Sequence, residues 1–229
     1  MILTTTSPPQ TSGQFKVTAF ISDKSFPCAG AKSALNRNRM RFAKFATLGA
    51  QPHALQLLDN LKEFFGEFEN PGADPESFVA MFDDSGADEA GFDAAPWREL
   101  QALHILDAAQ GGAWDSSVSS DVSYNKFSFS AGGRAYFIVG VLLNASRLSR
   151  RSPVTCLVSN FHDQFEALKT SRKFVQMQSS KRTRFVDLQG FVNPVLARYG
   201  KATEARQYSG RSVGDALKCP VHFETAAYV

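Results

Sequence analysis

Residues 127–166 read FSFSAGGRAYFIVGVLLNASRLSRRSPVTCLVSNFHDQFE and determine the expected architecture. Between Phe127 and Ala131, apolar residues alternate with serines, which predicts a strand with one buried face. Gly132 and Gly133 then supply a turn. Residues 136–143, YFIVGVLL, are apolar throughout and predict a central strand covered on both faces. With a third strand expected over residues 154–160, the segment predicts a sheet built around a hairpin.

The ends of these strands carry the side chains most suited to bind a ligand. Arg147, Arg150 and Arg151 follow the second strand, and guanidinium groups bind carboxylates or phosphates in bidentate fashion. An anionic ligand is one interpretation of this loop, and a solvated basic loop is the more common one. His162 lies at the junction between the third strand and a helix, where a side chain can project into a ligand-binding crevice.

The flanking sequence predicts two more strands and further helices. Pro27 and Pro96 each suit the first turn of a helix, because proline lacks the amide hydrogen that is unpaired there anyway. Apolar residues recur at helical spacing beyond Pro96 and again around Leu61. The expected helices cover residues 25–35, 53–69, 96–109 and 161–168, and the additional strands cover residues 39–48 and 76–82.

Composition places the chain among globular proteins. With 229 residues, of which 43% are hydrophobic, it can bury a sizeable core. The net charge of +3 does not indicate a nucleic-acid partner. No run approaches the ~20 apolar residues of a membrane span, so no membrane partner is expected. Three scattered cysteines without a paired metal spacing favour a reducing cytoplasm. A homodimer is left open.

The polar start of the chain differs from the rest. Residues 1–14 are rich in proline, serine and threonine and predict a disordered N-terminal segment. No repeat or linker follows, so residues 15–229 are expected to form one domain. The predicted class is α+β, a single domain with a central, mainly antiparallel sheet flanked by helices.

Two further side chains are candidates for chemistry. Cys28 would lie in the first turn of the helix over residues 25–35, where the helix dipole tends to lower a thiol pKa, although a buried inert cysteine is the commoner case. His104 precedes Asp107 by three residues on a helix, so the carboxylate could orient the imidazole; a structural histidine is the alternative. Residues 203–211, TEARQYSGR, are dense in hydrogen-bonding side chains and indicate a site or a buried polar network.

Six motifs follow one another along the chain: FPCAGAKSA (26–34), FSFS with Gly-Arg (127–130 and 133–134), NASR (144–147), NFHDQFE (160–166), EARQYSGR (204–211) and Cys-Pro (219–220). Together and in this order, they resemble the YqcI/YcgG family. This family includes the haem-dependent guanidine N-hydroxylases of guanitoxin biosynthesis and the related arginine hydroxylase of the D-cycloserine pathway. The similarity covers nearly the whole chain.

The resemblance implies haem b, whose pocket needs an axial histidine or cysteine and polar groups for two propionates. His162 is the expected iron ligand, with Cys28, Cys219 and His104 as alternatives. Glu204 and Glu166 are expected to hold a cationic substrate through charge-assisted hydrogen bonds. The expected cofactor-binding residues are Arg147, Arg151, Arg206, Tyr208 and Arg211.

The implied activity is that of a haem-dependent monooxygenase that N-hydroxylates a guanidino or amino group of a small, arginine-like molecule. Its partners would be that substrate, O2 and an electron donor. The chain departs from the family at Leu142, which occupies a position where a histidine is expected, and at residues 217–221, LKCPV, where a Trp-x-Cys-Pro-Phe ending is expected. The alternatives are a haem- or gas-binding protein without hydroxylase activity, and a cofactor-free protein with a buried polar network.

Overall fold

The computed structural model describes residues 11–69, 74–83, 89–170 and 203–208, together with Val186, Leu188 and Phe223. Five strands within these ranges form one sheet in the order β1-β2-β5-β4-β3. β1 and β2 run parallel, and the other neighbouring pairs are antiparallel. The predicted α+β class with a mainly antiparallel sheet is therefore confirmed. The strands are β1 (Met40–Phe45), β2 (Ser77–Phe82), β3 (Phe129–Ala131), β4 (Arg134–Val141) and β5 (Thr155–Phe161).

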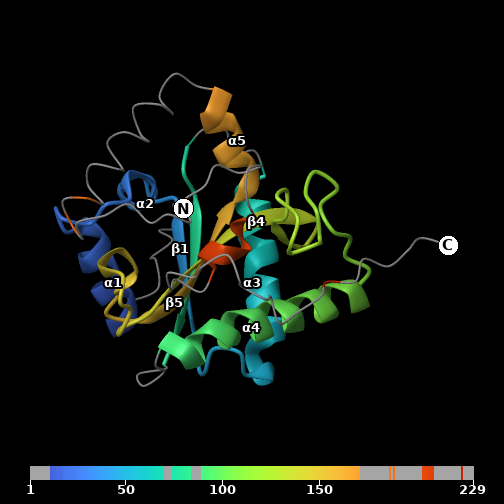
Figure 1. Ribbon diagram of the computed structural model, residues 1–229, viewed down its shortest axis with the longest axis horizontal. Helices are drawn as coiled ribbons and strands as arrows, with labels where there is room; N and C mark the ends of the chain where they lie inside the picture. The colour runs from blue at the N-terminus through green and yellow to red at the C-terminus, as the bar shows by residue number, and fades with distance from the viewer. Residues whose placement is uncertain are drawn as a thin grey trace, which may run out of the picture.

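Helices cover both faces of the sheet. Figure 1 shows α1 and α2 on one side of it and α3 and α4 on the other, with α5 at one end. The described helices are α1 (Ser12–Ser22), α2 (Ala29–Asn36), α3 (Ala54–Glu67), α4 (Glu89–Ala109) and α5 (His162–Thr170), with the 3-10 turns η1 (Gln51–His53), η2 (Leu148–Arg150) and η3 (Glu204–Gln207).

The two faces of the sheet bury two separate apolar cores. On the α3/α4 side, Ile138 and Leu157 pack with the leucines of both helices. On the α1/α2 side, Val79 and Cys156 pack with Val17. Strands with both faces covered read as continuous apolar runs, which explains why residues 136–143 show no alternation in sequence.

The predicted hairpin is present, and its turn requires glycine. Gly132 and Gly133 have φ values of 61° and 74°, which side chains other than glycine rarely adopt. The expectation of one solvated face on the first strand is wrong, because Ser128 and Ser130 are buried. Both serines are hydrogen-bonded to groups from distant segments, which the alternation of serines and apolar residues could not reveal.

The sequence analysis predicts no helix at the start of the chain, and it places the starts of α2 and α4 elsewhere than the structure does. α1 begins at Ser12, where Thr11 accepts a hydrogen bond from the Gln14 amide at 3.2 Å. Residues 12–14 of the expected disordered segment are thus helical, and residues 1–10 lie outside the described ranges. α2 begins only at Ala29, which makes Cys28 its N-cap residue rather than part of its first turn.

α4 begins at Glu89, seven residues before the expected start at Pro96. Proline in a helix interior removes a hydrogen bond and usually ends the helix, so the sequence pattern favoured a start there. Phe92 accounts for the difference, because its side chain is 1% exposed and packs in the α3/α4 core. Burial of this ring stabilises the turns that precede Pro96.

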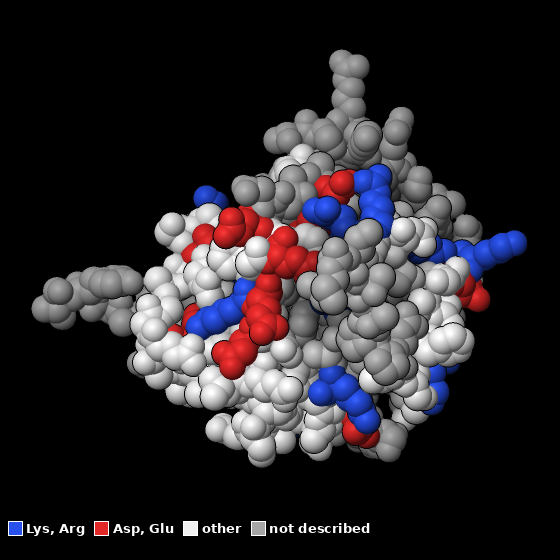
Figure 2. Space-filling view, turned by 180° about the vertical axis from the view of Figure 1, so that it is seen from behind, with Lys and Arg blue, Asp and Glu red and all other residues white. Residues whose placement is uncertain are grey.

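The described surface shown in Figure 2 carries acidic and basic side chains interspersed with uncharged ones. This mixture accords with a net charge of only +3. Among the helices that the structure describes, none combines the length and the apolar character that crossing a membrane would need.

Candidate functional site

His162 is placed by the end of β5. It begins α5 directly after Phe161, which pairs with Tyr136 of β4. The ring of Phe161 stacks on Phe64 of α3 with centroids 4.6 Å apart, and this contact fixes the strand end. His162 is 6% exposed, so its imidazole meets protein groups rather than bulk water.

Glu204 lies against this histidine although 42 positions separate them in the sequence. It opens η3, whose N-cap Thr203 accepts a hydrogen bond from the Ala205 amide. One carboxylate oxygen, Oε2, is 4.0 Å from Nδ1 of His162, a distance of electrostatic contact rather than of a direct hydrogen bond. The other oxygen, Oε1, accepts hydrogen bonds from Ser128 Oγ at 2.6 Å and from the Tyr208 hydroxyl at 2.7 Å. We call these four buried residues the His162 cluster.

Tyr208 anchors the cluster in the core. Its ring stacks on Trp97 with centroids 5.3 Å apart, and its hydroxyl accepts the Phe129 amide hydrogen at 3.0 Å. Burial raises the pKa of Tyr208 well above its usual value, and the negative charge of Glu204 raises this pKa further. The phenol therefore stays protonated at neutral pH and donates its hydrogen to Glu204.

Close packing on β4 brings η3 to this position. β3 pairs with β4 only as far as Tyr136, so the Gly140 amide has no strand partner on that edge and donates to the Tyr208 carbonyl at 2.8 Å. A Cβ at position 140 would collide with that carbonyl oxygen and would lie 2.8 Å from Cε1 of Phe92. Glycine at 140 is what lets the backbone of η3 approach the strand.

The cluster suits a histidine that binds through one ring nitrogen. A carboxylate beside Nδ1 favours the tautomer with the proton on Nδ1, in which Nε2 carries the lone pair that can coordinate a metal or accept a proton. Metal-binding histidines commonly have such a carboxylate behind them. In the described part of the chain, no group of three or more His, Cys, Asp and Glu residues could hold a bare metal ion. Haem iron needs only one protein ligand, so His162 fits it.

The arginines after β4 lie at the other end of the strand pair from His162. Val141 pairs with Cys156, whereas Tyr136 pairs with Phe161, and five strand residues span roughly 17 Å. Arg147 and Arg150 are buried in this loop. Arg151 is exposed, and its guanidinium donates to the Ala145 carbonyl at 2.9 Å.

Two of the other proposed iron ligands, Cys28 and His104, lie on elements that do not form the His162 cluster. Cys28 lies at the N-cap of α2, across the sheet from α3 and α4. His104 packs edge-on against Trp114 and Phe223 at centroid distances of 5.5 and 5.4 Å. Arg211 and Cys219 lie outside the described residues, as do the side chains of Glu166 on α5 and Arg206 on η3.

The structure contains a second buried histidine-carboxylate pair that was not predicted from the sequence. His53 Nε2 lies 3.2 Å from Oε2 of Glu99, which also accepts the Gly49 amide hydrogen at 2.8 Å. Burial raises the pKa of Glu99, and the Gly49 amide and His53 oppose this shift. The partners are 46 residues apart, and no local pattern marks the pair.

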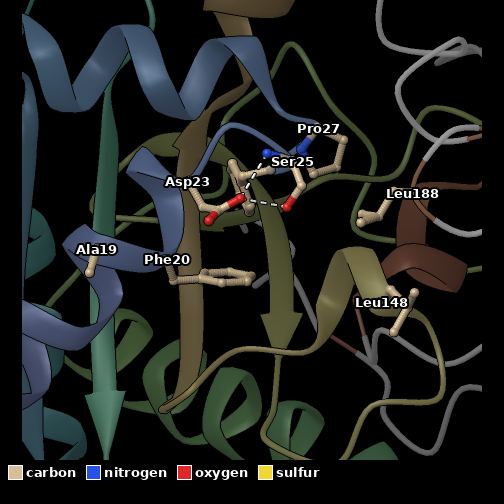
Figure 3. A pocket seen from close by; sticks show the side chains of 8 residues that line it. Ala19, Phe20, Asp23, Ser25, Pro27, Leu148 and Leu188 are labelled. Carbon is tan, nitrogen blue, oxygen red and sulfur yellow. Dashed lines mark hydrogen bonds between the residues drawn. The ribbon is translucent and has the colours of Figure 1, made fainter.

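A cavity of about 190 Å³ opens between α1, the start of α2 and η2. Figure 3 shows that Asp23 turns toward Ser25, whose amide and hydroxyl donate to the carboxylate at 2.8 and 2.6 Å. These hydrogen bonds lower the pKa of Asp23. Pockets for drug-sized ligands span ~300–1,000 Å³, so this cavity suits a smaller molecule. It is lined by Ala19, Phe20, Asp23, Ser25, Phe26, Pro27, Leu148 and Leu188.

Comparison with known proteins identifies the family. The model of the YqcI/YcgG family matches residues 17–222. The match therefore includes every described element that forms the His162 cluster. No curated protein and no solved structure matches the chain.

Proposed function

The chain belongs to the YqcI/YcgG family, and on this premise we propose that it is a haem-dependent monooxygenase that N-hydroxylates a guanidino or amino group of a small, arginine-like molecule. The observation that carries the proposal is the buried carboxylate of Glu204, 4.0 Å from Nδ1 of His162. Haem b, when bound, would supply the oxidant from O2 and electrons of an external donor. The free thiols of Cys28 and Cys156 support a cytoplasmic location.

Within this proposal, His162 binds the iron through Nε2. Glu204 stabilises the proton on Nδ1 and orients the ring, and it is itself held by Ser128 and Tyr208. This role differs from the one expected from sequence, in which Glu204 holds the substrate. Both of its oxygens already face groups of the protein, so Glu204 acts as a positioning residue and Glu166 remains the proposed acid for the cationic substrate.

The proposed contacts to the haem propionates also change. Arg206 lies two positions after Glu204 on η3, and with Arg211 it remains a proposed propionate partner. Arg147 lies at the far end of β4 from His162, and Arg151 is exposed and hydrogen-bonded to its own loop. We therefore do not assign Arg147 or Arg151 to the propionate that Arg206 would bind. Tyr208 serves the site indirectly, through its hydrogen bond to Glu204.

We expect His162→Ala to lose haem while the protein stays folded, because removal of the axial ligand removes the bond between iron and protein. The measurement is the Soret absorbance after haem titration, together with circular dichroism. The matched control is His53→Ala, which removes an imidazole that is equally buried beside a carboxylate. An unchanged ferric spectrum in His162→Ala would contradict the assignment, and a similar loss in His53→Ala would show that haem retention follows general stability.

A second candidate function is haem or gas binding without hydroxylation. Two observations favour it: Leu142 is 1% exposed within the apolar core, and Glu204 is engaged by the cluster. The two functions differ in turnover. Haem-loaded protein supplied with electrons, O2 and a set of guanidines and amines should give a product heavier by one oxygen atom if it is a hydroxylase. Bound haem without such a product would favour the binding function.

A further inference from the structure

Arg150 carries a buried positive charge that the described residues leave largely uncompensated. Its side chain is 8% exposed, and Nη1 donates to the Gly140 carbonyl at 3.2 Å. Across the described ranges, no other hydrogen bond and no carboxylate engages this guanidinium, which has five N–H donors. Buried charges in proteins are normally paired.

The fold keeps this charge in place. The Leu142 amide donates to the Arg150 carbonyl, and the Ser152 amide donates to the Leu142 carbonyl, both at 3.1 Å. These bonds hold η2 back against the end of β4. Burial, together with the smaller effect of the positive charge of the neighbouring, buried Arg147, lowers the pKa of Arg150 to about 9. The guanidinium is still protonated at neutral pH, so two positive charges are held close together inside the protein.

A helix N-terminus adds to the same positive region. Phe26 and Pro27, which precede the N-cap residue Cys28 of α2, line the same cavity as Leu148 of η2, so the start of α2 and the Arg150 loop border one space. Cys28 makes no side-chain capping hydrogen bond, and the first turn contains no acidic residue. The free amides at the start of a helix favour anions. Ser149, next to Arg150, has a buried hydroxyl without a partner in the described part of the protein.

We propose that Arg150, the N-terminal turn of α2 and the Ser149 hydroxyl form a binding site for an anionic group, a carboxylate or a phosphate. A bidentate guanidinium contact, amide hydrogens and a hydroxyl are the donors that such groups accept. The site lies at the opposite end of β4 from His162. It is therefore independent of iron ligation, and it would remain if the protein bound no haem.

Cys28 provides a reporter at this site. The measured quantity is the rate of Cys28 alkylation by iodoacetate, an anion, divided by the rate of its alkylation by iodoacetamide, which is neutral. This ratio should be higher in the wild type than in the Arg150→Met variant. We expect a change of about tenfold in this rate ratio, because a positive site concentrates anions locally. The ratio is measured for the Cys28 peptide by mass spectrometry. Taking a ratio cancels any difference in the fraction of thiolate.

Two control variants isolate the buried charge. Arg151→Met removes an exposed charge from the same loop and should leave the ratio within about twofold, since exposed charges are screened by solvent. Arg150→Lys keeps the charge and should keep most of the preference for iodoacetate. If Arg150→Met does not fold, Arg150→Gln removes the charge in its place. Equal ratios in the wild type, Arg150→Met and Arg150→Lys would overturn the proposal.

The source of the anion is tested by protection of Cys28. Phosphate or acetate should slow iodoacetate labelling of the haem-free wild type but not of Arg150→Met, which would indicate a free anion. Protection by haem but not by its dimethyl ester would identify a propionate as the occupant. If phosphate, acetate and haem all leave the rate unchanged, the site is not an anion site. The haem-free arm separates this result from failure of the proposed oxygenase function.

Discussion

Glu204 and Glu99 are buried carboxylates that each face a histidine, yet their surroundings differ. Glu204 receives hydrogen bonds from two hydroxyl groups on Oε1, and its other oxygen, Oε2, faces His162. Glu99 concentrates its contacts on one oxygen, which meets His53 and the Gly49 amide. A buried carboxylate is costly unless hydrogen bonds replace its water. The Glu99 pair ties η1 to α4, and the Glu204 pair is the one to which we assign the ligand in the proposed function.

The Glu99 pair should make stability depend on pH. Burial raises the folded-state pKa of Glu99 above its usual value of 4.5, so the native state holds this proton more tightly than the unfolded chain. The resulting stabilisation is fully present below the unfolded pKa and is lost as pH rises through the folded pKa. Each unit of upward shift costs ~1.4 kcal/mol at higher pH.

We therefore expect Glu99→Gln to become more stable relative to the wild type as pH rises above 4.5. Urea unfolding at a series of pH values gives the difference in free energy of unfolding. The matched control is Glu63→Gln, which removes an exposed charge from α3 and should change this free energy by less than about 0.5 kcal/mol. A Glu99→Gln difference that is constant with pH would contradict the expectation.

The docking of η3 on β4 shows how one element places the side chains of another. The Gly140 amide binds the Tyr208 carbonyl, and the same 3-10 turn carries Glu204 to His162. Residues 204 and 162 meet because the β3 edge of β4 lacks a strand partner beyond Tyr136 and because position 140 has no side chain. The geometry of the cluster thus depends on a glycine that touches none of its side chains.

Gly140→Ala should weaken both the fold and the site. The added methyl group meets backbone and a packed ring, so we expect a loss of ~1–3 kcal/mol in the free energy of unfolding. Displacement of Glu204 from His162 should also weaken haem binding. The matched control is Gly66→Ala in α3, where a methyl group would meet nothing within 4 Å.

Denaturant unfolding and haem titration measure the two effects. The control should stabilise α3 by ~0.5–1 kcal/mol, since alanine is the better helix former. If Gly140→Ala matched it in stability and haem affinity, η3 would not need close contact with β4.

The whole molecule is held together by two cores that share one sheet. Cys156 lies on β5, the middle strand, and is fully buried in the core on the α1/α2 side. Burial raises the pKa of its thiol to about 12. Solvent can reach Cys156 on β5 only if helices separate from the sheet. This thiol should therefore react with a reagent only when the protein unfolds globally.

Labelling of Cys156 by a thiol-specific disulfide reagent at pH 8 should therefore be negligible in the native protein. Only about one thiol in 10⁴ is ionised at that pH, and the reagent cannot reach it. The rate should rise with urea in parallel with the unfolding transition. Cys28, which is partly exposed, serves as the internal control. Labelling of Cys156 in native buffer at a rate near that of Cys28 would show that β5 opens locally.

Local patterns in the sequence were sufficient to predict several of the elements. The unbroken apolar run of β4, the paired glycines of the hairpin and the helical spacing of α3 each depend on neighbours within a few residues. The same holds for the position of His162 at a strand end. Hydrophobic period and turn chemistry are local properties, so they can be read without knowledge of the fold.

Contacts between distant residues could not be read in this way. The pairs of His162 with Glu204 and of His53 with Glu99, the burial of Ser128 and the uncompensated charge of Arg150 all arise where segments far apart in the chain meet. A polar residue looks the same in sequence whether water or a buried partner satisfies it. Whether water or a buried partner satisfies it depends on which segments cover the strand edges, and therefore on the packing of the whole chain.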